Sequence, residues 1–221
     1  MENYQKTVKA KFGLFSKFYD AFDLIFIFNK QTNPRYGLAE KIPNESRRIL
    51  DVCIGTANSS IIIAQKNPKN EIVGIDLSPN MIAVAENKIR KQKLKNIHFQ
   101  LMDATKMTFQ DSAFDIVTVS FGLHELNYEL MMKILKEMFR VLKNEGKIYI
   151  IDYGKQSNPI KIFLLSVFLK IFEPKHMPQF LNYNWMNILE NLGFENIKIE
   201  QYLFSKLILA NKSIQRTLTR R

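Results

Sequence analysis

The sequence predicts an α/β fold in one domain, built on a doubly wound and mostly parallel sheet. The chain has 221 residues, of which 46% are hydrophobic and 24% charged, enough for one sizeable core. Through its middle, short β-rich apolar runs alternate with helical patterns. Fully apolar strands separated by helices indicate a parallel sheet that is covered on both faces. The repeated alternation favours the doubly wound arrangement.

The elements follow in order along the chain. Strands are expected at 47–54, 71–78, 96–104, 114–122 and 147–154. Helices are expected between them at 59–67, 79–94 and 128–146, and the second of these carries a proline in its first turn. The third is expected to stop near Gly146. A last helix to Gly193 and two strands, forming a hairpin, would complete the sheet.

The two flanks have a different character. Aromatic residues recur at three- and four-residue spacing near the N-terminus, which indicates an amphipathic helix, at Phe12, Phe15, Tyr19, Phe22 and Phe26. Packing of this helix on the sheet is favoured over a membrane helix. The most apolar window, 160–172, is 13 residues long with two lysines, too short to cross a bilayer. The N-terminus lacks the apolar core of a signal peptide.

Cysteine content and charge limit the class of protein. The single cysteine, Cys53, excludes a disulfide framework and a cysteine-based zinc cage, so we expect a reducing cytosol and no metal. The net charge is +11, divided as +4 over 1–50, +1 over 51–152 and +6 over 153–221. Basic flanks suit nucleic acid, anionic lipid or an acidic substrate, and a lysine-rich solvated surface explains them equally well.

The loop after the first strand, in "LDVCIGTANSS", is where a doubly wound sheet binds its ligand. A dinucleotide site needs G-x-G-x-x-G, so that backbone N–H groups can approach a pyrophosphate. This loop has Gly55 alone, with Cys53 and Ala57 where further glycines are expected. The charge of Asp51 would also repel a pyrophosphate. An acid at this strand end suits a cationic ligand better.

Two more acids follow the next strands. Asp76 ends the second strand, 25 residues after Asp51, where a carboxylate can accept both hydroxyls of an adenosine ribose. Asp103, with Ala104, ends the third strand and can meet the adenine amino group. Each acid alone is explained by a helix cap or a strand-end turn. Together they outline a cationic adenosine ligand without phosphates, which is S-adenosylmethionine.

The sequence resembles the class I S-adenosylmethionine-dependent methyltransferases, and within them the ubiquinone/menaquinone C-methyltransferase family. The resemblance rests on "ILDVCIGTANSS", "VGIDLSPNMIAVA", "MDATKMTFQDSAFDIVTVSFGL" and "ILKEMFRVLKNEGKIYIIDY". It implies a seven-stranded sheet with the cofactor across the first strand ends. The cofactor-binding residues would be Asp51, Gly55 and Thr56 on the methionine side, Asp76 at the ribose, Asp103 and Ala104 at the adenine, Ser120 nearby, and Tyr19 of "FYDAFD" as a lid, with Leu77 and Met81 also at the cofactor.

The resemblance also implies one methyltransferase domain over residues 1–221. Its parts would be an N-terminal helical lid (1–45), a cofactor-binding core (46–154), a substrate-cap insertion (155–183), a C-terminal helix and strands (184–212) and a basic tail (213–221). The usual loop has two or three glycines, two of which Cys53 and Ala57 replace. Because alanine needs only slightly more room, we expect a tighter loop that still binds. Cys53 is expected to be a small filler.

Methyl transfer from a sulfonium is an in-line displacement that asks mainly for alignment and a dry site, with no covalent residue. A hydroquinone acceptor benefits from a base that removes its hydroxyl proton. The menaquinone-type enzymes carry Arg-Asn where this chain has His124 and Glu125. We take His124 as the candidate base with Glu125 as its orienter; a solvent-facing histidine at a helix start is the alternative. His98 is expected to be structural, and His176 is a candidate for the acceptor pocket.

The acceptor pocket is expected under a roof formed by the aromatic 12–28 and apolar 160–181 segments. Quinol-type C-methylation ranks first, with N- or O-methylation of a phospholipid amine or another small molecule as the alternative. RNA methylation is disfavoured, because "SFGLHEL" replaces the Asp/Asn-Pro-Pro-aromatic motif after the fourth strand. A non-catalytic cofactor-binding protein would keep the same acids. We expect a cytoplasmic enzyme that visits an anionic inner membrane face. The oligomeric state stays open.

Overall fold

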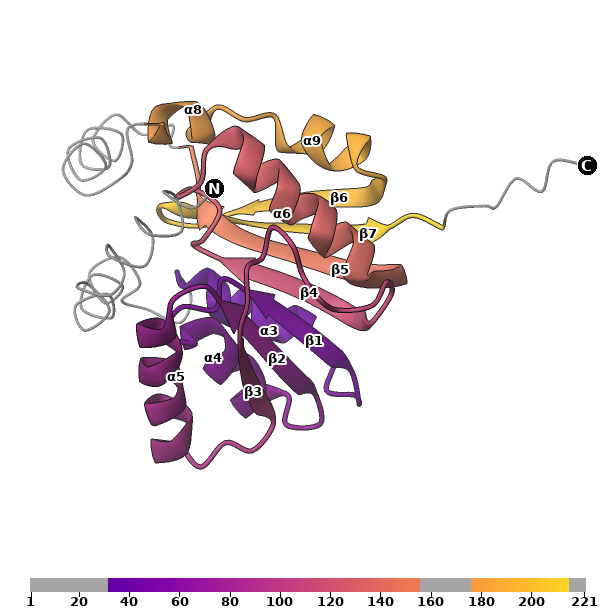
Figure 1. The fold of residues 1–221 in the computed structure, drawn as a ribbon. Coiled ribbons are helices and arrows are strands. Elements are labelled where there is room, and N and C mark those ends of the chain that lie inside the picture. Colours follow the sequence, from indigo (N-terminus) through magenta and orange to yellow (C-terminus); the bar gives the residue numbers. More distant parts are fainter. Residues whose placement is uncertain (1–31, 156–175, 215–221) are drawn as a thin grey trace, which may run out of the picture.

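The computed structural model describes residues 32–155 and 176–214 of the chain (Figure 1). The expected N-terminal aromatic helix, including Tyr19, and the apolar window 160–172 lie outside these ranges. The fold class predicted from the sequence is confirmed. The described chain forms one seven-stranded sheet with helices packed on both of its faces.

The strand order places a topological switch point in the middle of the sheet. The strands are β1 (Arg48–Val52), β2 (Glu71–Asp76), β3 (Ile97–Leu101), β4 (Phe114–Ser120), β5 (Leu142–Tyr153), β6 (Phe194–Gln201) and β7 (Ser205–Lys212). Their order across the sheet is β3-β2-β1-β4-β5-β7-β6, and β7 alone among these strands runs in the direction opposite to the other six. The chain order therefore reverses between β1 and β4, where the carboxyl ends of the strands leave room for a ligand.

Along the central strands, apolar side chains are buried on both faces of the sheet, and helices cover both faces. The helices are α3 (Pro34–Lys41), α4 (Asn58–Lys66), α5 (Pro79–Lys91), α6 (Tyr128–Val141), α8 (Met177–Leu181) and α9 (Trp185–Asn191). Leu50 packs with α6 and α9 on one face, and its neighbour Ile49 packs with α3 and α4 on the other. Within the described ranges, no helix has the length and apolar character that a bilayer span requires.

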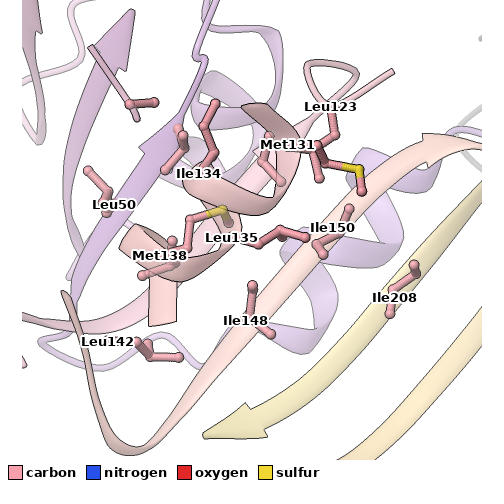
Figure 2. Packing of buried hydrophobic residues seen from close by; sticks show 14 of the residues in the cluster. Leu50, Leu123, Met131, Ile134, Leu135, Met138, Leu142, Ile148, Ile150 and Ile208 are labelled. Carbon is pink, nitrogen blue, oxygen red and sulfur yellow. The ribbon is translucent and has the colours of Figure 1, made fainter. Parts of the chain in front are cut away.

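Helix α6 supplies the centre of one half of the core (Figure 2). Met131, Ile134, Leu135 and Met138 recur at helical spacing and are fully or almost fully buried. Figure 2 shows them facing side chains of three strands, Leu50 of β1, Ile148 and Ile150 of β5, and Ile208 of β7. At its start, the Asn127 side chain accepts a hydrogen bond from the backbone N–H of Leu130 at 2.9 Å.

Helix α6 ends earlier than its sequence pattern predicts. The pattern placed the end near Gly146, whereas α6 stops at Val141 and β5 begins at Leu142. Leu142 has extended backbone angles, and its N–H still donates to the carbonyl of Met138. It pairs with Phe114 before a register shift leads to Ile116. Strand pairing in the sheet therefore overrides the helical pattern at 142–146. The expected C-terminal hairpin is confirmed as β6 and β7.

The connection from β3 to β4, residues 102–113, has no helix and is held by Arg140 of α6. Its guanidinium donates to the carbonyl oxygens of Met107 and Phe109, at 3.0 and 2.7 Å. It also pairs with Asp111 and Glu137, at 2.7 and 2.8 Å. This charge-assisted network positions the loop that begins with Asp103.

We expect Arg140→Lys to lower the free energy of unfolding by about 1–3 kcal/mol, because an ammonium cannot reproduce the guanidinium fork and leaves loop carbonyls unpaired. Urea denaturation of the full chain measures this. Lys133, whose pair with Glu129 lies on the exposed face of α6, is the control. Lys133→Ala is expected to cost less than about 0.5 kcal/mol. Equal effects of the two variants would contradict the role of Arg140.

Candidate functional site

A cavity of about 960 Å³, measured with its open mouth, lies at the carboxyl ends of the strands around the switch point. Nine of the residues that the sequence singled out line it together: Asp51, Gly55, Thr56, Asp76, Leu77, Met81, Asp103, Ala104 and Ser120. Tyr19 lies outside the described residues.

Asp51 is a buried carboxylate at the end of β1. The hydroxyl of Ser60 donates to its Oδ2 at 2.5 Å, and the hydroxyl of Thr118 donates to its Oδ1 at 2.8 Å. Burial raises the pKa of Asp51 to about 6, against the opposing effect of these hydroxyls and of the Arg35 charge. At neutral pH the group is therefore mostly ionised, and a nearby cation would favour that form.

The loop after β1 uses left-handed backbone conformations at three positions. Cys53, Gly55 and Ala57 have φ of 54°, 56° and 64°. A Cβ on Gly55 would meet no atom within 4 Å, so conformation rather than room is what favours glycine here. Cys53 and Ala57 adopt the same conformation at a cost of about 1–2 kcal/mol each. From the sequence we expected the replacement of glycine by Ala57 to matter through the size of the side chain. The structure shows that the left-handed backbone conformation is the physical reason why glycine is favoured in this loop.

Cys53 lies in this loop with its side chain half-buried and lining the cavity. Burial and the neighbouring carboxylates of Asp76 and Asp51 raise its pKa well above the ordinary value, so the sulfur stays protonated. A Cβ on Gly122 would lie 2.8 Å from the Cβ of Cys53, so glycine lets the β1 and β4 loops approach closely. The geometry fits a small filler.

Asp76 and Asp103 line the cavity and also hold turns. Asp76 accepts the backbone N–H of Gly55 at 2.9 Å and that of Ser78 at 2.8 Å. Burial raises the pKa of Asp76, and these N–H groups oppose the rise. Asp103 accepts both the N–H and the hydroxyl of Thr105, at 2.9 and 2.7 Å. The sequence offered a strand-end turn as the alternative explanation of these two acids. Both acids hold such a turn, and both also line the cavity.

Ser120 ends β4 with its hydroxyl oxygen buried and without a hydrogen-bond partner in the described part of the chain. Its side chain lines the cavity. A buried hydroxyl without a partner costs free energy that a polar ligand can recover. Together with three carboxylates in one cavity, it fits a ligand that carries positive charge and nucleoside hydroxyls.

His124 lies behind the cavity wall rather than in it. Its side chain is buried, with Nδ1 2.7 Å from Oδ1 of Asp152, and its backbone N–H donates to the other oxygen of that carboxylate. Glu125 does line the cavity, and its Oε1 is 3.8 Å from Nε2 of His124. His176 does not line the cavity; its Nε2 is 2.9 Å from the carbonyl oxygen of His124. His98 lies on β3, exposed.

Sequence reasoning missed residues both behind the cavity wall and in it. The contact of Asp152 in β5 with His124 could not be predicted, because the sequence of an apolar strand does not indicate which residue 28 positions away will pair with an acid inside it. Arg35 of α3 and Phe121 after β4, unlike Asp152, line the cavity itself. Arg35 stands in a short and weakly patterned helix, where only the packing of α3 against α4 brings it to the site.

Comparison with known proteins identifies the architecture and the family. The model of the ubiE/COQ5 methyltransferase family matches residues 1–201. A demethylmenaquinone methyltransferase from Leptospira interrogans is 30% identical over 236 aligned positions, covering 95% of this chain and 94% of that protein. One from Geobacillus sp. is 26% identical, covering 90% and 93%.

Solved structures share the fold. A SAM dependent methyltransferase from Aquifex aeolicus superposes with a TM-score of 0.65 at 21% identity, covering 83% of this chain and 92% of that one. Phosphoethanolamine N-methyltransferase 2 from Haemonchus contortus, solved in complex with S-adenosyl-L-methionine, gives a TM-score of 0.60 at 19% identity, covering 78% and 50%. Since the family match spans most of the sequence and the acids line one cavity of this fold, the chain belongs to the ubiE/COQ5 methyltransferase family and is a class I S-adenosylmethionine-dependent methyltransferase.

Proposed function

We propose that the protein methylates a ring carbon of a lipophilic quinol. The observation that carries the proposal is one continuous cavity whose two sides differ. Three carboxylates line it on the side of β1 to β3. On the side of β4 and α6, the apolar lining residues include Phe121, Leu126 and Ile134. The similarity over almost the whole chain to demethylmenaquinone methyltransferases supports the acceptor class.

Different residues of the chain are assigned to different parts of the cofactor. S-adenosylmethionine supplies an electrophilic methyl group on a positively charged sulfur. We assign Asp51, Gly55 and Thr56 to its methionine part, with the Asp51 carboxylate toward the ammonium. Asp76, Leu77 and Met81 take the ribose, and Asp103 and Ala104 take the adenine. Beside them Ser120 offers a hydroxyl that has no partner among the described residues. Tyr19 stays a predicted lid residue.

A quinol carbon attacks more readily when the neighbouring hydroxyl loses its proton. The sequence suggested His124 as the base and Glu125 as its orienter. The geometry supports the opposite assignment of these two roles, because Glu125 lines the cavity while His124 is buried behind it against Asp152. In this proposal Glu125 takes the hydroxyl proton. His124 is a positioning residue, and Asp152 holds its ring orientation through Nδ1.

The lipophilic character of the proposed acceptor also bears on where in the cell the protein acts. We propose a cytoplasmic protein that contacts an anionic membrane surface to reach its quinol, and the surplus of basic residues in 153–221 supports this contact.

The direct test is transfer of a labelled methyl group to a short-chain prenyl-1,4-naphthoquinol, kept reduced and embedded in lipid vesicles. Label should appear in the quinol, and faster in anionic than in zwitterionic vesicles, because basic segments concentrate the enzyme there. Equal rates in the two vesicles would remove the membrane proposal alone. Label in phosphatidylethanolamine, offered in parallel, would replace the quinol by an amine acceptor. Label in added RNA alone would overturn the proposal.

Glu125→Gln should lower kcat on the quinol by about 100-fold or more, the usual contribution of a general base, without changing affinity for S-adenosylhomocysteine. Glu129→Gln, on the exposed start of α6, is the matched control and should keep full activity. His124→Asn should lower kcat by a smaller factor and leave the acceptor KM unchanged. Full activity of Glu125→Gln would exclude Glu125 as the base.

The raised pKa of Asp51 predicts a pH-dependent affinity. The ionised carboxylate attracts an ammonium and the protonated form does not, so binding of S-adenosylhomocysteine should weaken as pH falls through about 6. The limiting slope is about tenfold per pH unit for one coupled proton. Calorimetry between pH 5 and 8 measures it, and Asp51→Asn should bind more weakly with the slope removed. Asp115→Asn, at a carboxylate paired with Lys143 and outside the cavity lining, should keep the slope.

A further inference from the structure

Lys206 of β7 is a buried cation in the half of the sheet that carries Asp152. Only 4% of the residue is exposed, which is rare for a lysine. Its Nζ lies 5.0 Å from the centre of the Trp185 ring and 5.6 Å from that of the Phe180 ring. Burial lowers the pKa of Lys206 to about 8, while contact with the two rings favours its charged form. The side chain is therefore mostly an ammonium at neutral pH.

The register of the sheet sets Lys206 beside Asp152. The two residues are Cα partners in the antiparallel pair of β5 and β7, so their side chains project from the same face. Asp152 is fully buried, and its attraction for the ammonium opposes the effect of burial on the pKa of Lys206. A buried carboxylate is costly unless a positive charge nearby balances it. Lys206 is one candidate for that charge.

His124 is the other candidate, because its ring contacts the same carboxylate. Nδ1 lies 2.7 Å from Oδ1 of Asp152, and the carboxylate also accepts the backbone N–H groups of His124 and Tyr153, at 3.2 and 2.8 Å. Three such contacts favour the ionised carboxylate. An ionised carboxylate only accepts hydrogen bonds, so Nδ1 carries a hydrogen. Whether the ring is neutral or an imidazolium then depends on Nε2.

The charge of this ring matters for Glu125, whose Oε1 lies 3.8 Å from Nε2 of His124. An imidazolium at this distance would stabilise the ionised form of Glu125 and make it a weaker base. The titratable groups of the described chain that surround the ring are Asp152 and Tyr153 of β5, Glu125 of its own segment, His176 before α8, and Lys206 of β7. The two acids favour an imidazolium, whereas the ammonium of Lys206 and the burial of the ring oppose it.

We propose that Lys206 is a positioning residue for methyl transfer: it carries the charge that balances Asp152 and so keeps the His124 ring neutral beside Glu125. The positive charge that the buried carboxylate requires is then held on β7, against Phe180 and Trp185, instead of next to the base. The consequence for the rate rests on the role of Glu125 proposed above. The protonation of His124 does not, because it is a property of the protein without substrate.

The direct test is nitrogen-15 NMR of the full chain with labelled histidine and no ligand. At pH 7 the His124 ring should be neutral, with its hydrogen on Nδ1. In Lys206→Met, which keeps an unbranched side chain and removes the charge, the pH at which His124 becomes an imidazolium should rise by about one pH unit or more. Lys206→Arg should keep the unmodified value, because a guanidinium is charged and also packs on aromatic rings.

Two controls separate this local effect from the general loss of a positive charge. Lys198→Met makes the same change at an exposed position of the neighbouring strand β6 and should leave the titration of His124 unchanged. His98, exposed on β3, should titrate alike in all variants. An imidazolium at His124 at pH 7 in the unmodified protein would overturn the proposal without any variant. Identical titration of His124 in the unmodified protein and in folded Lys206→Met would overturn it as well.

The pH dependence of the rate distinguishes positioning from a structural role. With the quinol, Lys206→Met should lower kcat about tenfold for each pH unit below the new titration of His124, and activity should return as pH rises toward 8. Lys206→Arg should keep the unmodified profile. An equal loss in Lys206→Met at every pH would show a structural role only and overturn the proposal. A neutral His124 in a protein that does not methylate the quinol would refute the proposed acceptor and support the charge assignment.

Discussion

The site depends on one buried interaction, the carboxylate of Asp51 held between two hydroxyls. Thr118 is its register partner on β4, and Ser60 belongs to α4, so the interaction joins the strands on both sides of the switch point to the helix that follows. A buried carboxylate without such donors would be costly and would stay protonated. With them it is mostly ionised near neutral pH, and it places a negative charge at the wall of the cavity.

A second carboxylate extends this arrangement along the sheet. Asp76 accepts the N–H of Gly55, so the end of β2 supports the loop that leaves β1. That loop stores left-handed conformations at Cys53 and Ala57, which persist because the surrounding bonds over-determine them. Strain at a ligand-binding loop of this kind is a common feature of pre-organised sites. The departure from a glycine-rich loop is therefore tolerated through tertiary support rather than through smaller volume.

The other half of the sheet provides a different environment. Asp152 of β5 binds both the ring and the backbone of His124, and His176 reaches back to the same segment. Rings of Tyr153 and Phe180 pack edge-on around His124. Lys206, buried over Phe180 and Trp185, has its pKa lowered to about 8 by burial. This apolar and hydrogen-bonded support orders the segment from which Glu125 enters the cavity.

The sequence by itself determined the α/β class, the succession of strands and helices along the chain and the acids at the strand ends, because burial on both faces imposes continuous apolar runs and each acid follows such a run directly. The family resemblance, now shown, came from the same local motifs. Only the tertiary structure decided the rest. Strand pairing ended α6 at Val141, backbone conformation explained the glycine positions, and packing brought Arg35 and Asp152 to residues far away in the chain. Contacts between such distant residues leave no periodic pattern, since each depends on how separate elements meet in space.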